Sequence, residues 1–390
     1  MLRFLTAGES HGKALVVIVE GLPSGLEVKK EDISAELGRR RLGFGRGPRM
    51  RFEQDEVTVL SGVRFGKSLG SPIAIEILNT EWPKWEVEMS VETGESKKIL
   101  TTPRPGHADL AGMQKYNLID ARDVLERASA RETAARVAAG SVAKVFLKSI
   151  GISILSHVVS IGSVRVDSSA ELPKFEDLEV IDASEVRCFD VNFEDAMVNE
   201  IKAAAKDGDS LGGTVEVVAY GVPVGIGSHV HWDRKLDGLL AHALMSIQAV
   251  KVVEIGEGID IAFRRGSEAH DPIHWDKENE SFRRFSHNSG GIEGGISTGE
   301  PIVVRASMKP LATLNRPVLK TVDVKTKEET VSFKERTDVT AVPALGVVSE
   351  TMVALVLASE VLRKFGGDSI GEIKSNVESY KNQLKTQLKN

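Results

Sequence analysis

The pentapeptide GESHG, at residues 8–12, places a serine directly before a histidine. Its letters match the bare G-x-S-x-G pattern of hydrolases, in which a strand precedes the nucleophile and a helix follows it. Here the residues that follow, KALVVIVEG, predict a strand instead, and neighbouring side chains of an extended chain point to opposite sides. We therefore predict that His11 is an acid–base group in its own right, and that Ser10 and His11 do not form a pair of nucleophile and base.

Arginine is concentrated in the stretch LGRRRLGFGRGPRMRF, residues 37–52, which we call the arginine-rich segment. It contains six arginines and four glycines, with neither an acidic residue nor a lysine. A guanidinium group donates two parallel hydrogen bonds to a carboxylate or phosphate and keeps its charge when desolvated, and glycines let the chain bend so that several such groups converge. The segment predicts a site for a small polyanionic metabolite. A solvated basic loop and a nucleic-acid or peptide-binding arm are the alternatives.

The stretch ERASARET, residues 126–133, suggests a second anion site. Ser129 followed three residues later by Glu132 predicts a capping box at the start of a helix, where free backbone N–H groups and the helix dipole favour an anion. Arg127 and Arg131 flank this start, where the dipole disfavours cations, so a bound anion would offset the repulsion. The alternative is an ordinary capped helix at the surface.

Two further motifs contain groups that could transfer or hold protons. In TPRPGHADLAG, residues 102–112, the Pro–Gly pair predicts a turn that projects His107 from a fixed backbone. In the segment beginning RTD, Arg336 and Asp338 would lie on one face of an extended chain. Taken alone, a histidine in a turn is more often structurally neutral than catalytic, and the R-x-D pair is also what a simple salt bridge requires.

These motifs need elements to position them, and hydrophobic periodicity predicts both strands and helices. Apolar or alternating stretches predict strands at residues 14–19, 71–77, 213–221 and 250–255. Apolar residues at helical spacing predict helices at 31–41, 129–146, 236–247 and 349–365, and an amphipathic C-terminal helix at 370–390. The apolar face of that last helix comprises Ile370, Ile373, Val377, Tyr380, Leu384 and Leu388.

Strands and helices are interleaved without a linker or a regular βαβ rhythm, so we predict one continuous α+β domain covering residues 1–390. Neither a G-x-G-x-x-G fingerprint that opens a strand–helix unit nor a Walker A sequence occurs. The net charge of −6 argues against binding to nucleic acid or to an anionic membrane surface.

Cys188 is the only cysteine, so an internal disulfide and a thiolate zinc site are excluded, and a reducing compartment is indicated. We expect no metal site. The N-terminus lacks an apolar segment of signal-peptide length, and we expect no stretch apolar enough to span a membrane. The expected location is the cytoplasm.

Six stretches, taken in order from residue 8 to about residue 365, resemble the signature motifs of the chorismate synthase family. They are GESHGKALVVIVEGLPSG, RPGHADLAGMQKY, ERASARETAARVAAGS, HALMSIQAVKVVEIG, GGIEGGISTGEPI and RTDVTAVPALGVVSE. The resemblance implies a core of two antiparallel β-sheets surrounded by helices, a β-α-β sandwich, in a homotetramer. It also implies a 1,4-anti elimination of phosphate from 5-enolpyruvylshikimate 3-phosphate to give chorismate, dependent on reduced FMN.

Matched motif by motif, the resemblance assigns roles to individual residues. His107 would supply a proton to the leaving phosphate, His11 would manage protonation near N1 of the reduced flavin, and Asp338 would assist N5. The substrate-binding residues would be Arg40, Arg46, Arg49, Arg131 and Arg336. The flavin-binding residues would be Arg127, Ala128, Ser129, Gln248, Ala249, Gly294, Lys309, Pro310, Leu311, Ala312, Thr313 and Arg336.

The departures from the family pattern are local. Ala128 replaces a more common serine, Thr337 replaces histidine or serine, and HNSGG near residue 287 replaces a His-His-Ala run. No dinucleotide fingerprint supports an intrinsic NADPH:FMN reductase, so an external flavin reductase is expected. The alternative functions are a non-enzymatic binder of phosphometabolites or nucleic acid, and a flavin oxidoreductase with net oxidation of its substrate.

Overall fold

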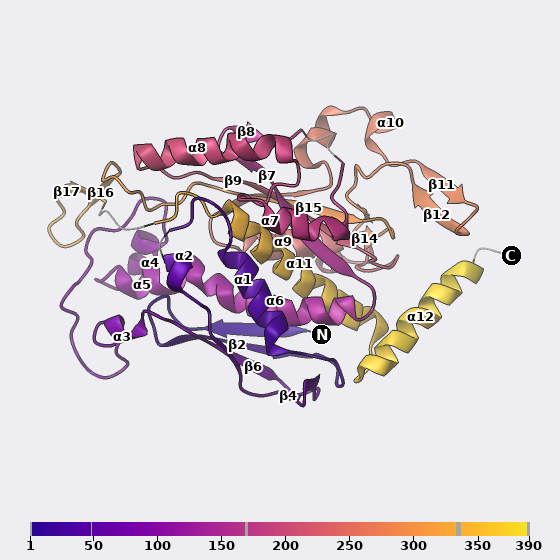
Figure 1. Ribbon diagram of the computed structural model, residues 1–390, viewed down its shortest axis with the longest axis horizontal. Helices are drawn as coiled ribbons and strands as arrows, with labels where there is room; N and C mark the ends of the chain where they lie inside the picture. Colours follow the sequence, from indigo (N-terminus) through magenta and orange to yellow (C-terminus); the bar gives the residue numbers. More distant parts are fainter. Residues whose placement is uncertain (1, 48, 168–170, 333–336, 388–390) are drawn as a thin grey trace.

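The computed structural model describes residues 2–47, 49–167, 171–332 and 337–387. Two antiparallel sheets enclose a layer of long helices (Figure 1). The first sheet has the order β1-β2-β6-β3, with β1 at Arg3–Ala7, β2 at Ala14–Glu20, β6 at Ile73–Leu78 and β3 at Val57–Val59. The second has the order β10-β15-β9-β7-β8, with β10 at Val250–Ile255, β15 at Ile302–Met308, β9 at Gly213–Tyr220, β7 at Ser153–Ile161 and β8 at Val164–Arg165.

The middle layer consists of α1 (Lys30–Arg41), α6 (Thr133–Lys148), α9 (Leu236–Met245) and α11 (Val342–Phe365). Helix α6 packs on the first sheet at β2, whereas α11 packs on the second sheet at β7 and β9. The predicted α+β class with two antiparallel sheets is confirmed. Helices α1, α6, α9 and α11 lie between the sheets, and the other helices, including the long helices α8 (Glu194–Asp207) and α12 (Ile370–Thr386), lie outside this layer.

The other elements connect these layers or cover them. Helix α7 (Leu178–Ala183) packs on the outer face of the second sheet, and α8 packs against β7 and β8 (Figure 1). The remaining helical elements are α2 (Arg49–Phe52), α3 (Trp82–Trp85), α4 (Asp109–Tyr116), α5 (Arg122–Ala128), η1 (Ala130–Glu132), η2 (Phe175–Asp177), η3 (Val191–Phe193), η4 (Trp232–Arg234), η5 (Gly258–Phe263), α10 (Gly266–Ala269) and α12 (Ile370–Thr386). Four hairpins complete the described elements: β4–β5 (Val63–Arg64, Lys67–Ser68), β11–β12 (Ile273–Asp276, Ser281–Arg284), β13–β14 (Ile292–Glu293, Ile296–Ser297) and β16–β17 (Lys320–Val322, Glu329–Val331).

The two sheets differ in how their outer faces are covered. On the second sheet, Leu155 of β7, Val218 of β9 and Val303 of β15 are buried in a small cluster with Ile181 of α7. This explains why β9 is apolar on both faces. The outer face of the first sheet is open, since Leu5 is 71% exposed and its cross-strand neighbour Ile18 is 41% exposed.

Helices α6 and α11 cross at close range because one residue lacks a side chain. A Cβ atom placed on Gly140 of α6 would lie 2.2 Å from Cβ of Thr351 on α11. Interiors are packed too densely to absorb such an overlap without movement of the backbone. The small residues predicted to form the apolar face of α6 therefore set the spacing of the middle layer.

Helix α11 differs from its prediction at one end. It begins at Val342, seven residues before the predicted start, because Pro343 occupies the first turn, where a missing N–H costs nothing. The helix is also long and apolar enough to cross a membrane by length and composition, so the expectation that no such stretch exists is wrong. The most apolar 18-residue window of α11 is 89% buried inside the protein, as expected for a core helix.

A group of charges is buried within the middle layer around Glu350 of α11. The carboxylate accepts hydrogen bonds from Arg39 Nη1 at 2.7 Å, Lys144 Nζ at 2.7 Å and Arg187 Nη2 at 3.2 Å. Burial alone would raise the pKa of Glu350, but these cations outweigh it and hold that pKa well below its usual range. The ion pair between Arg39 and Glu350 fixes the last turn of α1. It therefore also fixes the position of Arg40, which follows Arg39 in the sequence.

Helix α12 packs on the body only through its first half. Ile373 and Val377 are buried, and the Tyr380 ring meets Phe365 of α11 edge-on, with ring centroids 5.6 Å apart. Beyond Tyr380 the helix projects away from the other elements (Figure 1). Leu388, assigned to the apolar face of this helix from the sequence, lies outside the described residues.

The Gly140→Ala substitution should destabilise the protein by about 2 kcal/mol, because overpacking of a filled core costs about 1–3 kcal/mol. Urea unfolding measures the change. Gly238→Ala in α9 is the matched control, since a Cβ atom there meets no heavy atom within 4 Å, and an alanine in a helix is expected to be neutral or stabilising. Equal effects of the two substitutions would show that the α6–α11 contact does not set the packing.

Candidate active site

The register of the second sheet brings three segments to one edge. Val250, at the start of β10, pairs with Met308 at the end of β15, and Met308 pairs with Gly213 at the start of β9. The residues just beyond these strand ends must therefore meet. Lys309 N donates to Ala249 O at 3.0 Å, which places the predicted flavin-binding segments 248–249 and 309–313 together.

Asp338 joins the arginine-rich segment to the same edge. Its carboxylate accepts a hydrogen bond from Gly47 N at 2.6 Å and lies 2.9 Å from Arg46 Nε. Next to it, Val339 N donates to Gly45 O at 2.8 Å. A Cβ atom on Gly47 would lie 2.9 Å from Asp338 Oδ1, so a larger residue here would displace the carboxylate. The structure thus brings together Arg46 and Asp338, which the sequence separates widely.

A cavity of about 500 Å³ opens between the arginine-rich segment and α8. Its walls include three cationic side chains, Arg41, Arg46 and Lys202, together with Thr337. Arg46 Nη1 is buried and has no hydrogen-bond acceptor among the described residues. A buried guanidinium nitrogen that lacks an acceptor is suited to an anionic ligand.

Arg40 lies behind Arg46, at the end of α1, and is only 4% exposed. Its Nε donates to Thr133 Oγ1 at 3.0 Å and its Nη2 to Ala130 O at 3.2 Å, whereas Nη1 finds no acceptor within the described part of the chain. Burial, reinforced by the nearby charges of Arg131 and Arg46, lowers the pKa of Arg40 to about 10. The group stays cationic at neutral pH and retains an unused donor.

Arg131 is also buried, but its three nitrogens already have protein partners. Nε donates to Asn79 Oδ1 at 2.9 Å, Nη1 bonds to Asp55 Oδ1, and Nη2 lies 3.6 Å from Glu53 Oε1. The carboxylates therefore position this guanidinium and compete with any anion that approaches it.

The predicted capping box at Ser129 is only half correct. The Ser129 hydroxyl does accept a hydrogen bond from Arg131 N, at 3.2 Å, but it caps the 3₁₀ turn η1 that precedes α6. The Glu132 carboxylate does not return to Ser129; it accepts from Thr6 Oγ1 at 2.7 Å and from Gln248 Nε2 at 3.1 Å. These long-range contacts link the predicted flavin residue Gln248 to the start of α6.

Two other predicted flavin residues lie beside this junction. Arg127, near the end of α5, donates from Nη2 to Thr6 O at 2.9 Å and remains 43% exposed at its side chain. Ala128 is the last residue of α5 and precedes Ser129 directly.

His11 is held on two sides. Its Nδ1 lies 3.0 Å from Glu126 Oε1, and its ring stacks on Trp85 with centroids 4.2 Å apart. Burial would raise the pKa of Glu126, but hydrogen bonds and charge from His11 and Arg122 lower it. The ionised Glu126 orients the imidazole so that Nε2 is the nitrogen available for proton transfer.

The Ser10 hydroxyl accepts a hydrogen bond from an arginine. Arg49 Nη1 donates to Ser10 Oγ at 3.1 Å and lies 3.4 Å from His11 Nε2. In the described chain, no hydrogen bond joins Ser10 Oγ to the His11 ring. Arg49 is therefore the partner that the structure gives to Ser10 Oγ, and the separate roles of Ser10 and His11 stay a prediction.

His107 forms a hydrogen bond with the carboxylate of Asp109, which is fully buried. Asp109 Oδ1 bonds to His107 Nδ1, and Asp109 Oδ2 accepts from Arg104 Nε at 2.9 Å. Arg104 Nη1 in turn donates to Thr313 Oγ1 at 3.0 Å, and Lys309 Nζ bonds to Gly106 O, so the histidine turn is tied to segment 309–313. A proton held on Nδ1 by Asp109 leaves Nε2 as the exchanging nitrogen.

The sequence model of the chorismate synthase family matches residues 2–362. The chain belongs to the chorismate synthase family. It is similar to the chorismate synthase of Saccharopolyspora erythraea, with 58% identity over 389 residues that cover 97% of this chain and 96% of that protein. The chorismate synthase of Thermobifida fusca is 56% identical over 393 residues, covering 98% and 99% of the two chains. A crystal structure of a chorismate synthase superimposes with a TM-score of 0.80 and 44% identity, covering 99% of this chain and 98% of that one.

Gly294, a flavin residue expected from the family motifs, does not join the others within one chain. It lies in the turn of the β13–β14 hairpin, where Ile296 pairs with Gly227. Gly227 O accepts a hydrogen bond from Arg363, near the end of α11, whereas Asp338 lies just before its start. Most of the 24-residue helix α11 separates these positions, which is about 30 Å at 1.5 Å per residue.

Arg336, expected to bind both substrate and flavin, lies outside the described residues. The groups that the sequence did not identify are mainly acids that hold the cations: Glu126 for His11, and Asp55 and Glu53 for Arg131. Asp109, by contrast, is a local signal in the sequence, because it follows His107 by two residues in the same motif. Glu126 is 115 residues from His11, and nothing in the sequence connects them.

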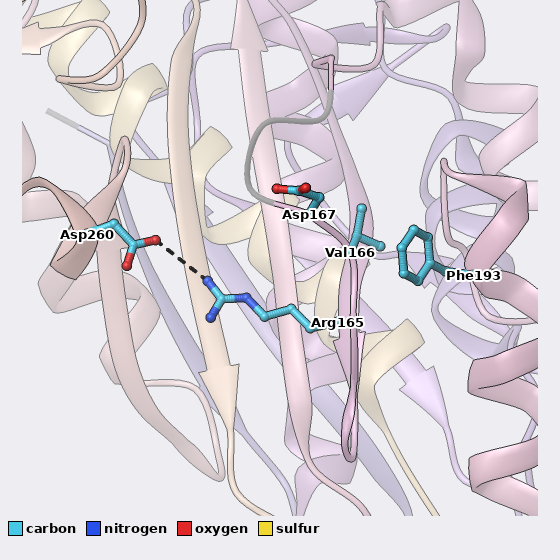
Figure 2. A pocket seen from close by; sticks show the side chains of 5 residues that line it. All are labelled: Arg165, Val166, Asp167, Phe193 and Asp260. Carbon is cyan, nitrogen blue, oxygen red and sulfur yellow. Dashed lines mark ion pairs between the residues drawn. The ribbon is translucent and has the colours of Figure 1, made fainter.

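A second pocket, of about 460 Å³, lies at the β8 edge of the second sheet (Figure 2). Arg165 and Asp260 face each other across it, with Nη2 and Oδ2 3.9 Å apart, and both side chains are well exposed. Among the described residues predicted for catalysis or binding, none lines this pocket. Within the described chain, no group of three or more His, Cys, Asp or Glu residues could hold a metal ion.

Asp109→Asn should destabilise the protein by about 3 kcal/mol at pH 7, since removing one partner of a buried ion pair costs about 3–5 kcal/mol. Burial would raise the pKa of Asp109, but bonds from His107 and Arg104 hold it well below its usual range. The carboxylate therefore stabilises the fold at pH values above about 4, the unfolded value, and this stabilisation is lost as the pH falls toward the folded pKa.

Urea unfolding at pH 7 and pH 3 measures the difference in the free energy of unfolding between the wild type and Asp109→Asn. This difference should be smaller at pH 3. The control is Asp233→Asn, because Asp233 accepts from His231 at the same i, i+2 spacing on an exposed surface. A pH-independent difference for Asp109→Asn would contradict the assignment.

Proposed function

We propose that this protein catalyses the 1,4-anti elimination of phosphate from 5-enolpyruvylshikimate 3-phosphate, which yields chorismate and phosphate. Membership of the chorismate synthase family makes it an enzyme of the lyase class. The observation that supports the reaction most strongly is the meeting of Arg40 and Arg46, each with a buried unused donor, beside the carboxylate of Asp338. The substrate carries one phosphate and two carboxylates, which such donors bind well.

The residues at the sheet edge suit the ring of reduced FMN. Gln248 Oε1 is buried without a hydrogen-bond donor among the described residues, so it could accept from an N–H of the ring. Gln248 Nε2 donates to Glu132 at 3.1 Å, and the next residue, Ala249, accepts from Lys309 N at 3.0 Å. Ala249 has φ of 66°, a left-handed conformation that non-glycine residues adopt at a cost. When bound, reduced FMN supplies electron density that assists departure of the phosphate.

The two histidines and Asp338 are assigned to proton handling. The reaction breaks the C–O bond to phosphate and a C–H bond at C6, forms a second ring double bond, and involves no net oxidation. We assign His107 Nε2 to the proton given to the departing phosphate, His11 Nε2 to a proton held near the cofactor, and Asp338 to the proton that leaves C6. A general acid of this kind typically contributes about 10²–10⁴-fold to the rate.

We further infer a homotetramer located in the cytoplasm, with reduced FMN supplied by an external flavin reductase and without nucleic-acid or membrane partners. The open outer face of the first sheet, with Leu5 and Ile18 exposed, supports association between copies. We also propose that residues 1–390 form one domain, because one continuous hydrophobic cluster includes residues of both sheets and of α12.

Phosphate release from 5-enolpyruvylshikimate 3-phosphate, measured anaerobically with and without dithionite-reduced FMN, tests the reaction. Release that requires reduced FMN, with chorismate formed in equal amount, is the expected result. Net oxidation of the substrate would instead identify a flavin oxidoreductase, and binding without turnover would identify a non-enzymatic phosphometabolite protein.

His107→Ala should lower kcat by about 10²–10⁴-fold with little change in KM, because it removes the proton donor to the leaving group. The matched control is His231→Ala, since His231 bonds to Asp233 at the same spacing but is 55% exposed at its side chain. Wild-type kcat in the His107 variant would refute the assignment, provided that circular dichroism shows both variants folded.

Arg49→Ala should raise the KM for substrate by about 10- to 100-fold, the equivalent of losing one charged hydrogen bond. Steady-state kinetics with saturating reduced FMN measure it. Arg64→Ala serves as the control, because the Arg64 guanidinium lies over the ring of the exposed Phe65, away from the site. An unchanged KM in the Arg49 variant would remove this arginine from the substrate-binding set.

A further inference from the structure

Asp55 is a buried acid placed among the cations of the site, and the proposed reaction gives it no role. It is 2% exposed and lies between α2 and β3. Its Oδ1 bonds to Arg131 Nη1, but its Oδ2 is buried without a hydrogen-bond donor among the described residues. Arg41 Nε lies 3.9 Å from Oδ2, which is beyond hydrogen-bond distance.

The backbone conformation of Asp55 is also energetically unfavourable. Its φ is 52°, in the left-handed region. Among residues with a side chain, Asn and Asp enter this region most readily. Asparagine has the same shape, could accept the same bond from Arg131, and would avoid burial of a charge. The geometry alone therefore does not require an aspartate, and the negative charge itself must supply the advantage.

That charge acts on the arginine cluster, which we define as Arg40, Arg46 and Arg131. Asp55 opposes the lowering of the Arg40 pKa by burial, as does Asp338, whereas Arg131 and Arg46 reinforce it. Three guanidinium groups thus face three carboxylates, because Glu53 also lies 3.6 Å from Arg131 Nη2. Asp338 pairs with Arg46 and Asp55 pairs with Arg131, so each of these two carboxylates takes up a donor that an anionic ligand could otherwise use.

We propose that Asp55 is an internal counter-ion that competes with bound anions for the arginine cluster and so lowers its affinity for inorganic phosphate. The inference rests on the proposed function in one respect, that this cluster binds the phosphate ester. A substrate with three anionic groups can overcome the competition through its other contacts, but a lone phosphate cannot. Asp55 is in this sense a specificity-determining residue, which favours the substrate over the phosphate that the reaction releases.

The Asp55→Asn variant tests the proposal, because it keeps the shape, the left-handed backbone and an acceptor for Arg131 while removing the charge. Titration calorimetry with inorganic phosphate should show binding about three- to tenfold tighter than in the wild type, and the gain should shrink as salt is added. Phosphate should also become a stronger inhibitor of turnover by the same factor. A residue that merely held the fold would change phosphate affinity in the opposite direction.

Asp182→Asn is the matched control. Asp182 also accepts hydrogen bonds from arginines, Arg39 Nε at 2.7 Å and Arg187, but it lies on α7, apart from the arginine cluster. Its substitution should leave phosphate affinity unchanged. Asp55→Gly is the second variant, since glycine accepts a positive φ, and it too should bind phosphate more tightly than the wild type.

Equal or weaker phosphate binding by Asp55→Asn, or binding undetectable in both that variant and the wild type, would overturn the proposal. Weaker binding by both Asp55 variants would show that Asp55 acts only by holding Arg131. Turnover of 5-enolpyruvylshikimate 3-phosphate by the wild type is measured separately. A failure of the proposed function would appear in that turnover assay, and a failure of the counter-ion role would appear only in the phosphate affinities.

Discussion

The arrangement of the site is constrained by the cost of burying cations of like charge close together. Arg40, Arg46 and Arg131 come from two distant parts of the sequence and lie in one buried region, where their mutual repulsion would oppose folding. The chain offsets this cost with carboxylates placed against individual guanidinium groups, Asp55 at Arg131 and Asp338 at Arg46. The acceptors around Arg40 are uncharged, a hydroxyl and a backbone carbonyl, and its Nη1 keeps an unused donor.

The sheets and helices make this convergence possible without any single long motif. The antiparallel register of the second sheet brings the segments beyond β10, β15 and β9 to one edge. The close crossing of α6 and α11 at Gly140, and the ion pair between Arg39 and Glu350, then hold the end of α1 over the start of α6. Packing in the middle layer and charge balance at the edge are thus parts of one arrangement.

Much of this could be predicted from the sequence where the signal is local. The strand at Val250–Ile255, the helix ending at Arg41 and the turn before His107 all follow from periodicity or from turn residues. The start of α11 was missed because Pro343 suits a first helical turn as well as a loop. The second half of the capping box failed because Glu132 is drawn to Thr6 and Gln248, which are close only in the folded chain.

The acids of the site illustrate the limit of a single sequence. Arginine clusters and histidines in turns are conspicuous, but Glu53, Asp55 and Glu126 look like ordinary charged residues until their partners are known. Their roles depend on distances between segments that lie 76 and 115 residues apart. Family motifs identify the groups that contact ligands more readily than those that hold these groups in place.

Glu350 shows what this dependence means for sequence change. Its carboxylate, on the core helix α11, accepts hydrogen bonds from three cations, which are Arg39 of α1, Lys144 of α6 and Arg187. Loss of the acid alone would strand those charges in the interior, and loss of one cation would weaken the rest, so substitutions here are not additive. During evolution, Glu350 should therefore be replaced only together with one of its partners. Relatives that differ at Glu350 should also differ at Arg39, Lys144 or Arg187.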